Sequence, residues 1–208
     1  MSTNINNIEV ELRGPLSKDE FVKLNEFLKM RGSFKLNKER ILIDYSTFIP
    51  SQGLEGRTKD IRLRVTNKIP EIIVKIGKMG GTESRKEISI LVKHGDFDKL
   101  VQVFAAIGLT KGMLCVRRSR VYMYKNVEFS LIEVPNHSFY FEAEKLVSSI
   151  KSRERVQKDI KKVCKRLGLK LFNDKTFFLY IKKLNKEANE IFNFKKYREN
   201  YFKDRFCL

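Results

Sequence analysis

The chain of 208 residues carries 43 Lys plus Arg against 25 Asp plus Glu, and this net charge of +18 favours an anionic partner such as a polyphosphate, a nucleotide, RNA or an acidic membrane. Its hydrophobic fraction of 42% excludes wholesale disorder and is enough for the core of one full-sized domain. Three scattered cysteines, two histidines, a polar start and the lack of a long apolar run argue against a disulfide framework, a zinc site, a signal peptide and a membrane span, so we expect a cytoplasmic protein.

The first predicted element is a strand in "NIEVELRG", where charged and apolar residues alternate. Glu9, Glu11 and Arg13 share one face, because successive side chains of a strand point to opposite sides. The two carboxylates would stand about 7 Å apart and repel each other unless a positive group lies between them. On a single half-solvated strand, such a pattern indicates only exposure to water.

Helical periodicity follows three times along the chain. The segment 17–32 has Ser17 with Glu20 three residues later, which is the signature of a capping box, and it ends at Gly32. The segments 96–108 and 148–168 show the same apolar spacing and also end at a glycine. We expect the apolar stripes of all three helices to pack against the core.

Further strands between these helices repeat the charged face. "DIRLRV" and "IIVKIGK" carry cations, "SRKEISILV" combines a cation with an acid, "VRRSRVYMY" carries cations again and "SFYFEAEK" carries acids. The charged residues on these faces are Arg62, Arg64, Lys75, Arg85, Glu87, Arg118, Arg120, Glu142 and Glu144. Together with turn signals such as "VTNKIP", these strands predict an antiparallel sheet.

Several strands with one charged face need a large wetted surface. A closed barrel provides it, since a water-filled lumen takes the charged faces and helices cover the apolar faces. In such a lumen the acids can gather a divalent cation, and the Arg and Lys side chains can clamp phosphate oxygens. The acids expected to converge are Glu9, Glu11, Glu142 and Glu144.

The order of these strands resembles the CYTH family, also called the triphosphate tunnel metalloenzymes, which includes thiamine triphosphatases, inorganic triphosphatases and class IV adenylyl cyclases. The resemblance covers about residues 5–184, from the first Glu-x-Glu strand to the aromatic-rich segment near Lys183. It implies an α+β fold in which an eight-stranded antiparallel β tunnel is flanked by helices. We therefore expect a tunnel domain over residues 1–184 and a basic, aromatic C-terminal extension over residues 185–208.

Carried over position by position, the resemblance implies a metal site and a triphosphate site. Glu9, Glu11, Glu142 and Glu144 would be the catalytic acids that hold Mg²⁺ or Mn²⁺, with Glu87 as a further tunnel acid. The phosphate-binding residues would be Arg13, Arg62, Arg64, Lys75, Arg85, Arg118 and Arg120. The chain departs from the family at Ile132, where many members carry an Asp, and the neighbouring Glu133 would face the other way.

These residues predict a metal-dependent hydrolase of inorganic or organic triphosphates. Oxygen ligands suit Mg²⁺ or Mn²⁺, while Arg and Lys side chains neutralise and align the phosphates during transfer. Two alternatives stay open: a class IV-type adenylyl cyclase that makes cyclic AMP from ATP, and a non-catalytic binder of polyphosphate, nucleotides or triphosphorylated RNA ends. The sequence does not identify the organic group that the triphosphate carries.

The C-terminal extension interleaves aromatic and basic residues. Its aromatic residues are Phe192, Phe194, Tyr197, Tyr201, Phe202 and Phe206. Such a pattern can bind RNA through phosphate contacts and stacked bases. We favour the other interpretation, in which the aromatics dock on the barrel or on a second subunit of a homodimer while the charges stay in water.

Overall fold

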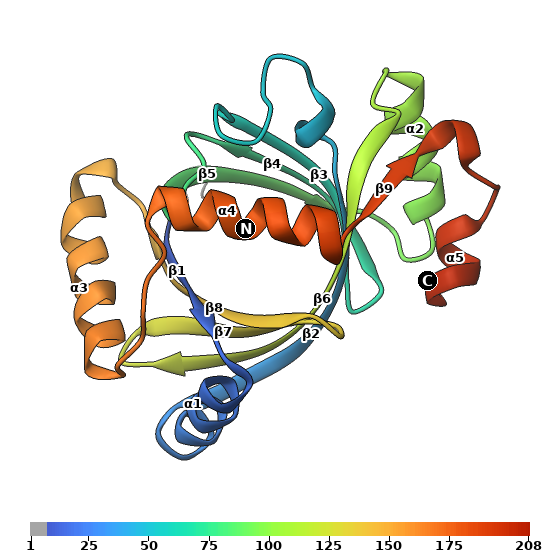
Figure 1. Cartoon of the computed structure of the whole chain (residues 1–208). Helices are drawn as coiled ribbons and strands as arrows, with labels where there is room; N and C mark the ends of the chain where they lie inside the picture. Colours follow the sequence, from blue (N-terminus) through green and yellow to red (C-terminus); the bar gives the residue numbers. More distant parts are fainter. Residues whose placement is uncertain (1–7) are drawn as a thin grey trace.

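Eight antiparallel strands close into a barrel (Figure 1), so the predicted α+β tunnel fold is confirmed. The computed structural model describes residues 8–208, and the polar start of the chain lies outside the described residues. Around the barrel the order is β2-β3-β4-β5-β1-β8-β7-β6, and β6 pairs with β2 to complete the circle. The strands are β1 Ile8–Leu16, β2 Ser33–Asp44, β3 Lys59–Thr66, β4 Ile69–Ile76, β5 Thr82–Leu91, β6 Lys111–Tyr124, β7 Val127–Val134 and β8 Ser138–Val147.

Helices surround this barrel on several sides. They are α1 Lys18–Arg31, α2 Phe97–Ala106, α3 Arg153–Arg166, α4 Asp174–Glu187 and α5 Tyr201–Phe206. α1 begins at the predicted capping box: the Glu20 amide donates to Ser17 Oγ at 3.1 Å, and the Ser17 amide donates to Glu20 Oε2 at 2.7 Å. Among the described residues, no helix combines the length and the apolar character needed to cross a bilayer.

The apolar faces of the strands point out of the barrel and are covered by the helices. Leu12 of β1 and Phe141 of β8 are fully buried in a cluster that includes residues of α1 and α3. On the other side, Leu63 of β3 is buried in a cluster with Phe97 and Val101 of α2. Because the helices bury these faces, the opposite, charged faces of the same strands line the lumen.

β2 was not predicted from the sequence. Its segment "SFKLNKERILID" carries polar residues on both faces, and the first half of the strand is largely exposed. The segment therefore lacks the alternation that marks the other strands. Nevertheless it pairs along most of its length with β6 and, near its end, with β3. These two pairings close the barrel, so the closure depends on long-range register that local alternation does not encode.

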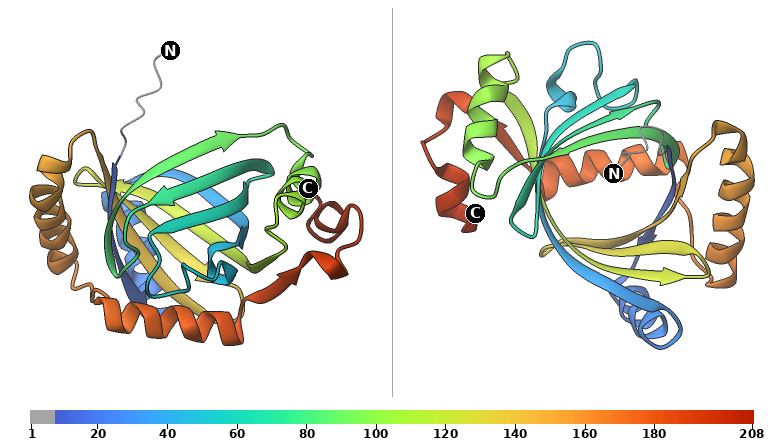
Figure 2. Two further views of the ribbon diagram at one scale, coloured as in Figure 1. Left: turned by 90° about the horizontal axis from the view of Figure 1, so that it is seen from above. Right: turned by 180° about the vertical axis from the view of Figure 1, so that it is seen from behind.

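α4 lies across one mouth of the barrel (Figures 1 and 2). The linker before it passes directly over β1, where the Phe172 amide donates to the Arg13 carbonyl at 2.8 Å. A Cβ atom at Gly14 would lie 1.9 Å from the Lys170 carbonyl oxygen, so only glycine permits this close approach. At the start of the helix, the Gly81 amide donates to Asp174 Oδ1 at 3.0 Å. These contacts fix the helix over the mouth.

The C-terminal segment is packed onto the barrel. α4 runs across the expected boundary at Leu184, and β9 Glu190–Asn193 pairs with the start of β6. Phe192 and Phe202 are buried in the cluster that contains α2, and the Asp98 carboxylate accepts a hydrogen bond from the Phe202 amide at 3.1 Å. The predicted docking of the aromatics on the barrel is confirmed.

Candidate active site

The register of β1 with its neighbours assembles the acidic wall of the tunnel. Glu11 lies opposite Glu144 of β8 on one side and opposite Glu83 of β5 on the other. Arg13 lies opposite Glu142. Residues directly opposite on adjacent strands share a face, so the charged groups of three strands meet in the lumen.

Three of the four predicted metal-binding acids come together. Carboxylate oxygens of Glu9, Glu11 and Glu144 lie within 4.8 Å of one another. Glu142 is drawn instead to Arg13, whose Nε donates to Glu142 Oε1 at 3.2 Å. The predicted convergence of four acids therefore narrows to these three, which we call the carboxylate trio.

The pKa values of these acids differ because their surroundings differ. Burial, followed by the Glu9 and Glu142 carboxylates, raises the pKa of Glu144 to about 7. Burial also raises the pKa of Glu11 well above its ordinary value, and Arg13 offsets this only in part. For Glu142, burial is outweighed by the Arg13 and Arg40 guanidiniums, which hold its pKa below the ordinary value. Nearby cations thus compensate the charges of Glu11 and Glu144 only incompletely, whereas they compensate that of Glu142.

Arg13 lies at the centre of the acidic wall. Its guanidinium contacts Glu11 at 2.7 Å and also contacts Glu83. Its Nη1 donates to the Gly80 carbonyl at 3.2 Å. Arg13 therefore points into the tunnel, as predicted, and joins β1 to the loop after β4.

Most other tunnel cations are paired with carboxylates. Lys75 contacts Glu9 and also Glu87, the latter at 2.9 Å, and Arg64 contacts Glu71 at 2.5 Å. These contacts place all three predicted residues, Arg64, Lys75 and Glu87, on the tunnel face.

Asp60 is a second centre of charge that the sequence did not reveal. Arg57 and Arg85 each approach its carboxylate at 2.9 Å, and Arg62 contacts it too. Although burial raises the pKa of Asp60, the three guanidiniums dominate and hold it well below the ordinary value. The predicted residues Arg62 and Arg85 thus face the lumen around this buried acid.

Arg40 and Arg117 differ from these paired cations. They lie directly opposite each other on β2 and β6, and within residues 8–208 no carboxylate is within ion-pair distance of either. Arg117 Nη2 donates to Asn189 Oδ1 at 2.9 Å, and Arg40 Nε donates to Thr66 Oγ1 at 3.4 Å. Burial and the nearby Arg64 guanidinium lower the pKa of Arg40. The positive charge of this pair is therefore poorly compensated.

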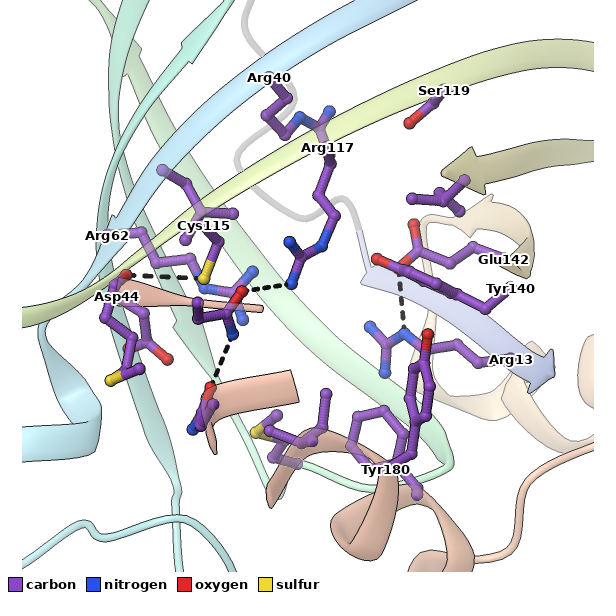
Figure 3. A pocket seen from close by; sticks show the side chains of 18 of the residues that line it. Arg13, Arg40, Asp44, Arg62, Cys115, Arg117, Ser119, Tyr140, Glu142 and Tyr180 are labelled. Carbon is purple, nitrogen blue, oxygen red and sulfur yellow. Dashed lines mark hydrogen bonds and ion pairs between the residues drawn. The ribbon is translucent and has the colours of Figure 1, made fainter. Parts of the chain in front are cut away.

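A cavity of about 120 Å³ lies beside this pair (Figure 3). Four arginines line it, namely Arg13, Arg40, Arg62 and Arg117. Its other wall is largely apolar and aromatic, and it comes mainly from α4 and the linker before it. That wall includes Met79, Met113, Tyr140, Phe172, Phe177, Tyr180 and Ile181. The cavity thus offers a cationic side for an anion and an apolar side for an organic group.

Arg118 and Arg120 do not face the tunnel, so their predicted position is wrong. Both are exposed and line a separate hollow of about 220 Å³ on the outside of the barrel, where Arg120 lies 5.7 Å from the ring centroid of Phe21 of α1. The cause is Tyr122, on the same face, which is buried in the outer core and donates to Asn25 Oδ1 at 2.8 Å. Alternation along β6 then turns Arg117 inward.

Ile132 and Glu133 of β7 face opposite sides of the barrel wall, as predicted. Ile132 lines the tunnel cavity, whereas Glu133 lines the outer hollow beside Arg118. The tunnel therefore has an apolar side chain at this point in place of an acid.

Several tunnel residues were missed from the sequence. Glu83 has the same parity as Arg85 and Glu87, and this pattern could have found it. Arg40 and Arg117 had no such signal, because β2 was not predicted and "VRR" offers an arginine to each face of β6.

No family model matches the chain. Among curated proteins, it is similar to the "Putative adenylate cyclase" of Methanocaldococcus jannaschii, with 29% identity over 170 residues that cover 78% of this chain and 90% of the relative. Among solved structures, a Pyrococcus horikoshii protein has a TM-score of 0.67 at 23% identity, covering 84% of this chain and 99% of its own.

A second solved structure comes from Hippeastrum and is described as an adenylyl cyclase candidate with a dominant triphosphatase activity. It has a TM-score of 0.55 at 14% identity and covers 80% of this chain and 90% of its own. At these identities, both structures show that the fold is shared.

Proposed function

We propose that the tunnel binds an organic triphosphate and hydrolyses one of its phosphoanhydride bonds with the help of Mg²⁺ or Mn²⁺. The similarity to the M. jannaschii and Hippeastrum proteins supports this proposal. The observation that carries this proposal is the pair of Arg40 and Arg117. Like charges directly opposite on adjacent strands destabilise a sheet, and the burial of Arg117, which is 8% exposed, increases the cost, while Arg40 is half-buried. A chain of phosphates would neutralise both, and guanidinium groups suit its geometry.

The carboxylate trio fits the ion that the resemblance implies. Glu9, Glu11 and Glu144 offer only oxygen atoms, which Mg²⁺ and Mn²⁺ prefer. Glu11 Oε1 is buried and accepts no hydrogen bond, although Arg13 Nε lies 2.7 Å from it, and within the described residues no hydrogen bond or ion pair engages the Glu144 carboxylate. When bound there, a divalent ion would neutralise negative charge on the phosphoryl oxygens.

The remaining tunnel residues would bind and orient the substrate. Arg13 lies between the trio and the cavity, since it contacts Glu11 and also lines the cavity wall. Together with Arg62, Arg40 and Arg117 it would hold the phosphate oxygens along the tunnel. The resulting alignment is the main contribution that a protein makes to phosphoryl transfer.

The aromatic wall favours an organic triphosphate over an inorganic one. Tyr180 of α4 lies 5.2 Å from Phe172 in a stacked arrangement, and its hydroxyl lies 2.9 Å from Ser138 Oγ. Contact between these aromatic side chains and an organic group would strengthen binding, whereas a third phosphate in the same place would make no favourable contact with them.

The competing reaction is cyclisation of ATP. The description of the M. jannaschii relative supports it, while the description of the Hippeastrum protein supports hydrolysis. A non-catalytic binder would give neither product. We favour hydrolysis because the carboxylate trio and the arginines suit any triphosphate, whereas cyclisation also requires a ribose to be held in one orientation.

One experiment separates these three functions. Purified protein is incubated with ATP, thiamine triphosphate or tripolyphosphate, each with Mg²⁺, Mn²⁺ or a chelator, and the products are resolved by ion-exchange chromatography. We expect metal-dependent release of inorganic phosphate, with an organic triphosphate as the better substrate. Cyclic AMP with pyrophosphate would instead establish the cyclase, and binding without any product would establish the binder.

A further inference from the structure

α3 has two faces of very different character. Its apolar residues Val156, Ile160, Val163 and Cys164 pack into the cluster on the outside of β1 and β8. Its other face points away from the barrel at the flank opposite α2 and α5 (Figure 2). The tunnel chemistry does not use this outer face.

The outer face of α3 is strongly basic. Seven of the fourteen residues of the helix are Lys or Arg, and all seven are exposed, while only Glu154 and Asp159 are acidic. None of the seven forms an ion pair with another residue of the described range 8–208. The seven are Arg153, Arg155, Lys158, Lys161, Lys162, Lys165 and Arg166, and we call them the α3 basic face.

An ordinary solvated helix mixes charges of both signs, which pair at spacings of three and four residues. The α3 basic face has five more cations than acids along about 21 Å of helix axis. Positive charge of this density attracts a regular polyanion. Duplex nucleic acid fits, because it carries one negative charge per about 1.7 Å of its axis.

A membrane is a poorer partner for this face. Surface helices bind lipid by burying apolar side chains between the head groups. Here Ile160, Val163 and Cys164 are already buried against the barrel, so only electrostatic attraction would keep α3 on a membrane surface. A single strand is also a poorer partner, since the outer face of α3 has no aromatic side chain on which bases could stack.

We propose that the α3 basic face binds the phosphate backbone of duplex nucleic acid without reading its sequence. This surface differs from the C-terminal segment that the sequence suggested for RNA, because the aromatics of that segment are packed against the barrel. The proposal is independent of the tunnel, so a duplex with 5′-hydroxyl ends is the appropriate probe.

The test is fluorescence anisotropy with RNA and DNA duplexes of about 20 base pairs, long enough to exceed the length of α3, at increasing salt and with a chelator present. One variant carries Lys158→Gln, Lys161→Gln, Lys162→Gln and Lys165→Gln. Its matched control carries Lys29→Gln, Lys59→Gln, Lys111→Gln and Lys195→Gln, four exposed lysines on other elements. Both variants lose the same charge, and glutamine keeps helix propensity.

We expect wild type to bind either duplex with an affinity that falls steeply with salt. The α3 variant should bind at least about tenfold more weakly, with a flatter salt dependence, because each lost phosphate contact reduces the slope by about 0.9. The control should bind within about threefold of wild type, since only net charge has changed. Circular dichroism and thermal melting verify that both variants are folded.

Three results would overturn the proposal. Equal losses in the two variants would mean that net charge alone binds the duplex. Full binding by the folded α3 variant would place the contact elsewhere. Tighter, α3-dependent binding to phosphatidylserine vesicles than to either duplex would identify a membrane as the partner.

Discussion

The neighbouring residues Arg117 and Arg118 provide a matched test of the phosphate site. They have the same side chain on the same strand, but Arg117 lines the tunnel cavity and Arg118 lines the outer hollow. Arg117 is 8% exposed and its guanidinium is bound to Asn189 Oδ1 at 2.9 Å, so it is oriented before the substrate arrives. Replacing Arg117 with Ala removes one charge-assisted contact to phosphate and leaves the outer face unchanged.

A charge-assisted hydrogen bond contributes about 1.5–3 kcal/mol, which corresponds to a loss in affinity of about 10- to 150-fold. We therefore expect Arg117→Ala to weaken the binding of a triphosphate by this factor. Stability should change by less than about 1 kcal/mol, because the lost bond to Asn189 is offset by relief of the repulsion from Arg40.

The assay is calorimetric titration of tripolyphosphate, and of ATP, into wild type, Arg117→Ala and Arg118→Ala, with urea denaturation of all three. Arg118→Ala should bind both ligands within about twofold of wild type, because a charge on the far side of the barrel wall is screened by solvent. If the two variants bind equally well, or if Arg118→Ala is the weaker binder, the assignment of the tunnel as the phosphate site is refuted.

Three further predictions follow from the same network of charges and packing. Glu144→Gln should weaken Mn²⁺ binding at least about tenfold in calorimetry, whereas Glu133→Gln on the outer face should not, and equal affinities would contradict the carboxylate trio. Asp60→Asn should lower the free energy of unfolding by about 3–5 kcal/mol in urea, because it leaves three arginines, two of them fully buried, without their shared acid, and a loss below about 1 kcal/mol would be inconsistent with this role. Phe202→Ala should cost about 3–5 kcal/mol of stability, since the ring is fully buried, while triphosphate affinity stays at the wild-type level; loss of affinity in the folded variant would link this segment to the site.

Alternation alone predicted much of the tunnel. On β1 the charged and apolar residues separate cleanly, and the same holds for the tunnel arginines of β3. Glu9, Glu11, Arg13, Arg62 and Arg64 therefore lie on the predicted face. A period of two is sufficient for such strands, because one face must be buried under the helices.

β6 shows where alternation is insufficient. "VRRSR" places an arginine on each face, so the face that points into the tunnel is decided by which side chain of β6 is buried in the core outside the barrel. That choice rests on Tyr122, whose hydroxyl donates to Asn25 of α1, 97 residues away in the chain. The sequence near Arg117 contains no trace of this contact.

The Arg40–Arg117 pair depends on the closure of the barrel. The two residues are brought together only by the register of β2 with β6, and β2 has polar residues on both faces. The sequence of neither strand shows which strand it pairs with, because the β2–β6 pairing that closes the barrel is determined by the register of the whole sheet. The observation that best supports the proposed function was therefore accessible only from the three-dimensional structure.

The proposed reaction is tested by phosphate release from an organic triphosphate, measured against Mn²⁺ concentration for wild type and for Glu11→Gln. We expect release by wild type to rise with Mn²⁺ and to saturate, and the variant to be at least about 100-fold slower at every concentration, because Glu11 belongs to the trio and also contacts Arg13. Release that needs no divalent ion, or that proceeds equally fast in the folded variant, would refute metal-dependent hydrolysis at the carboxylate trio.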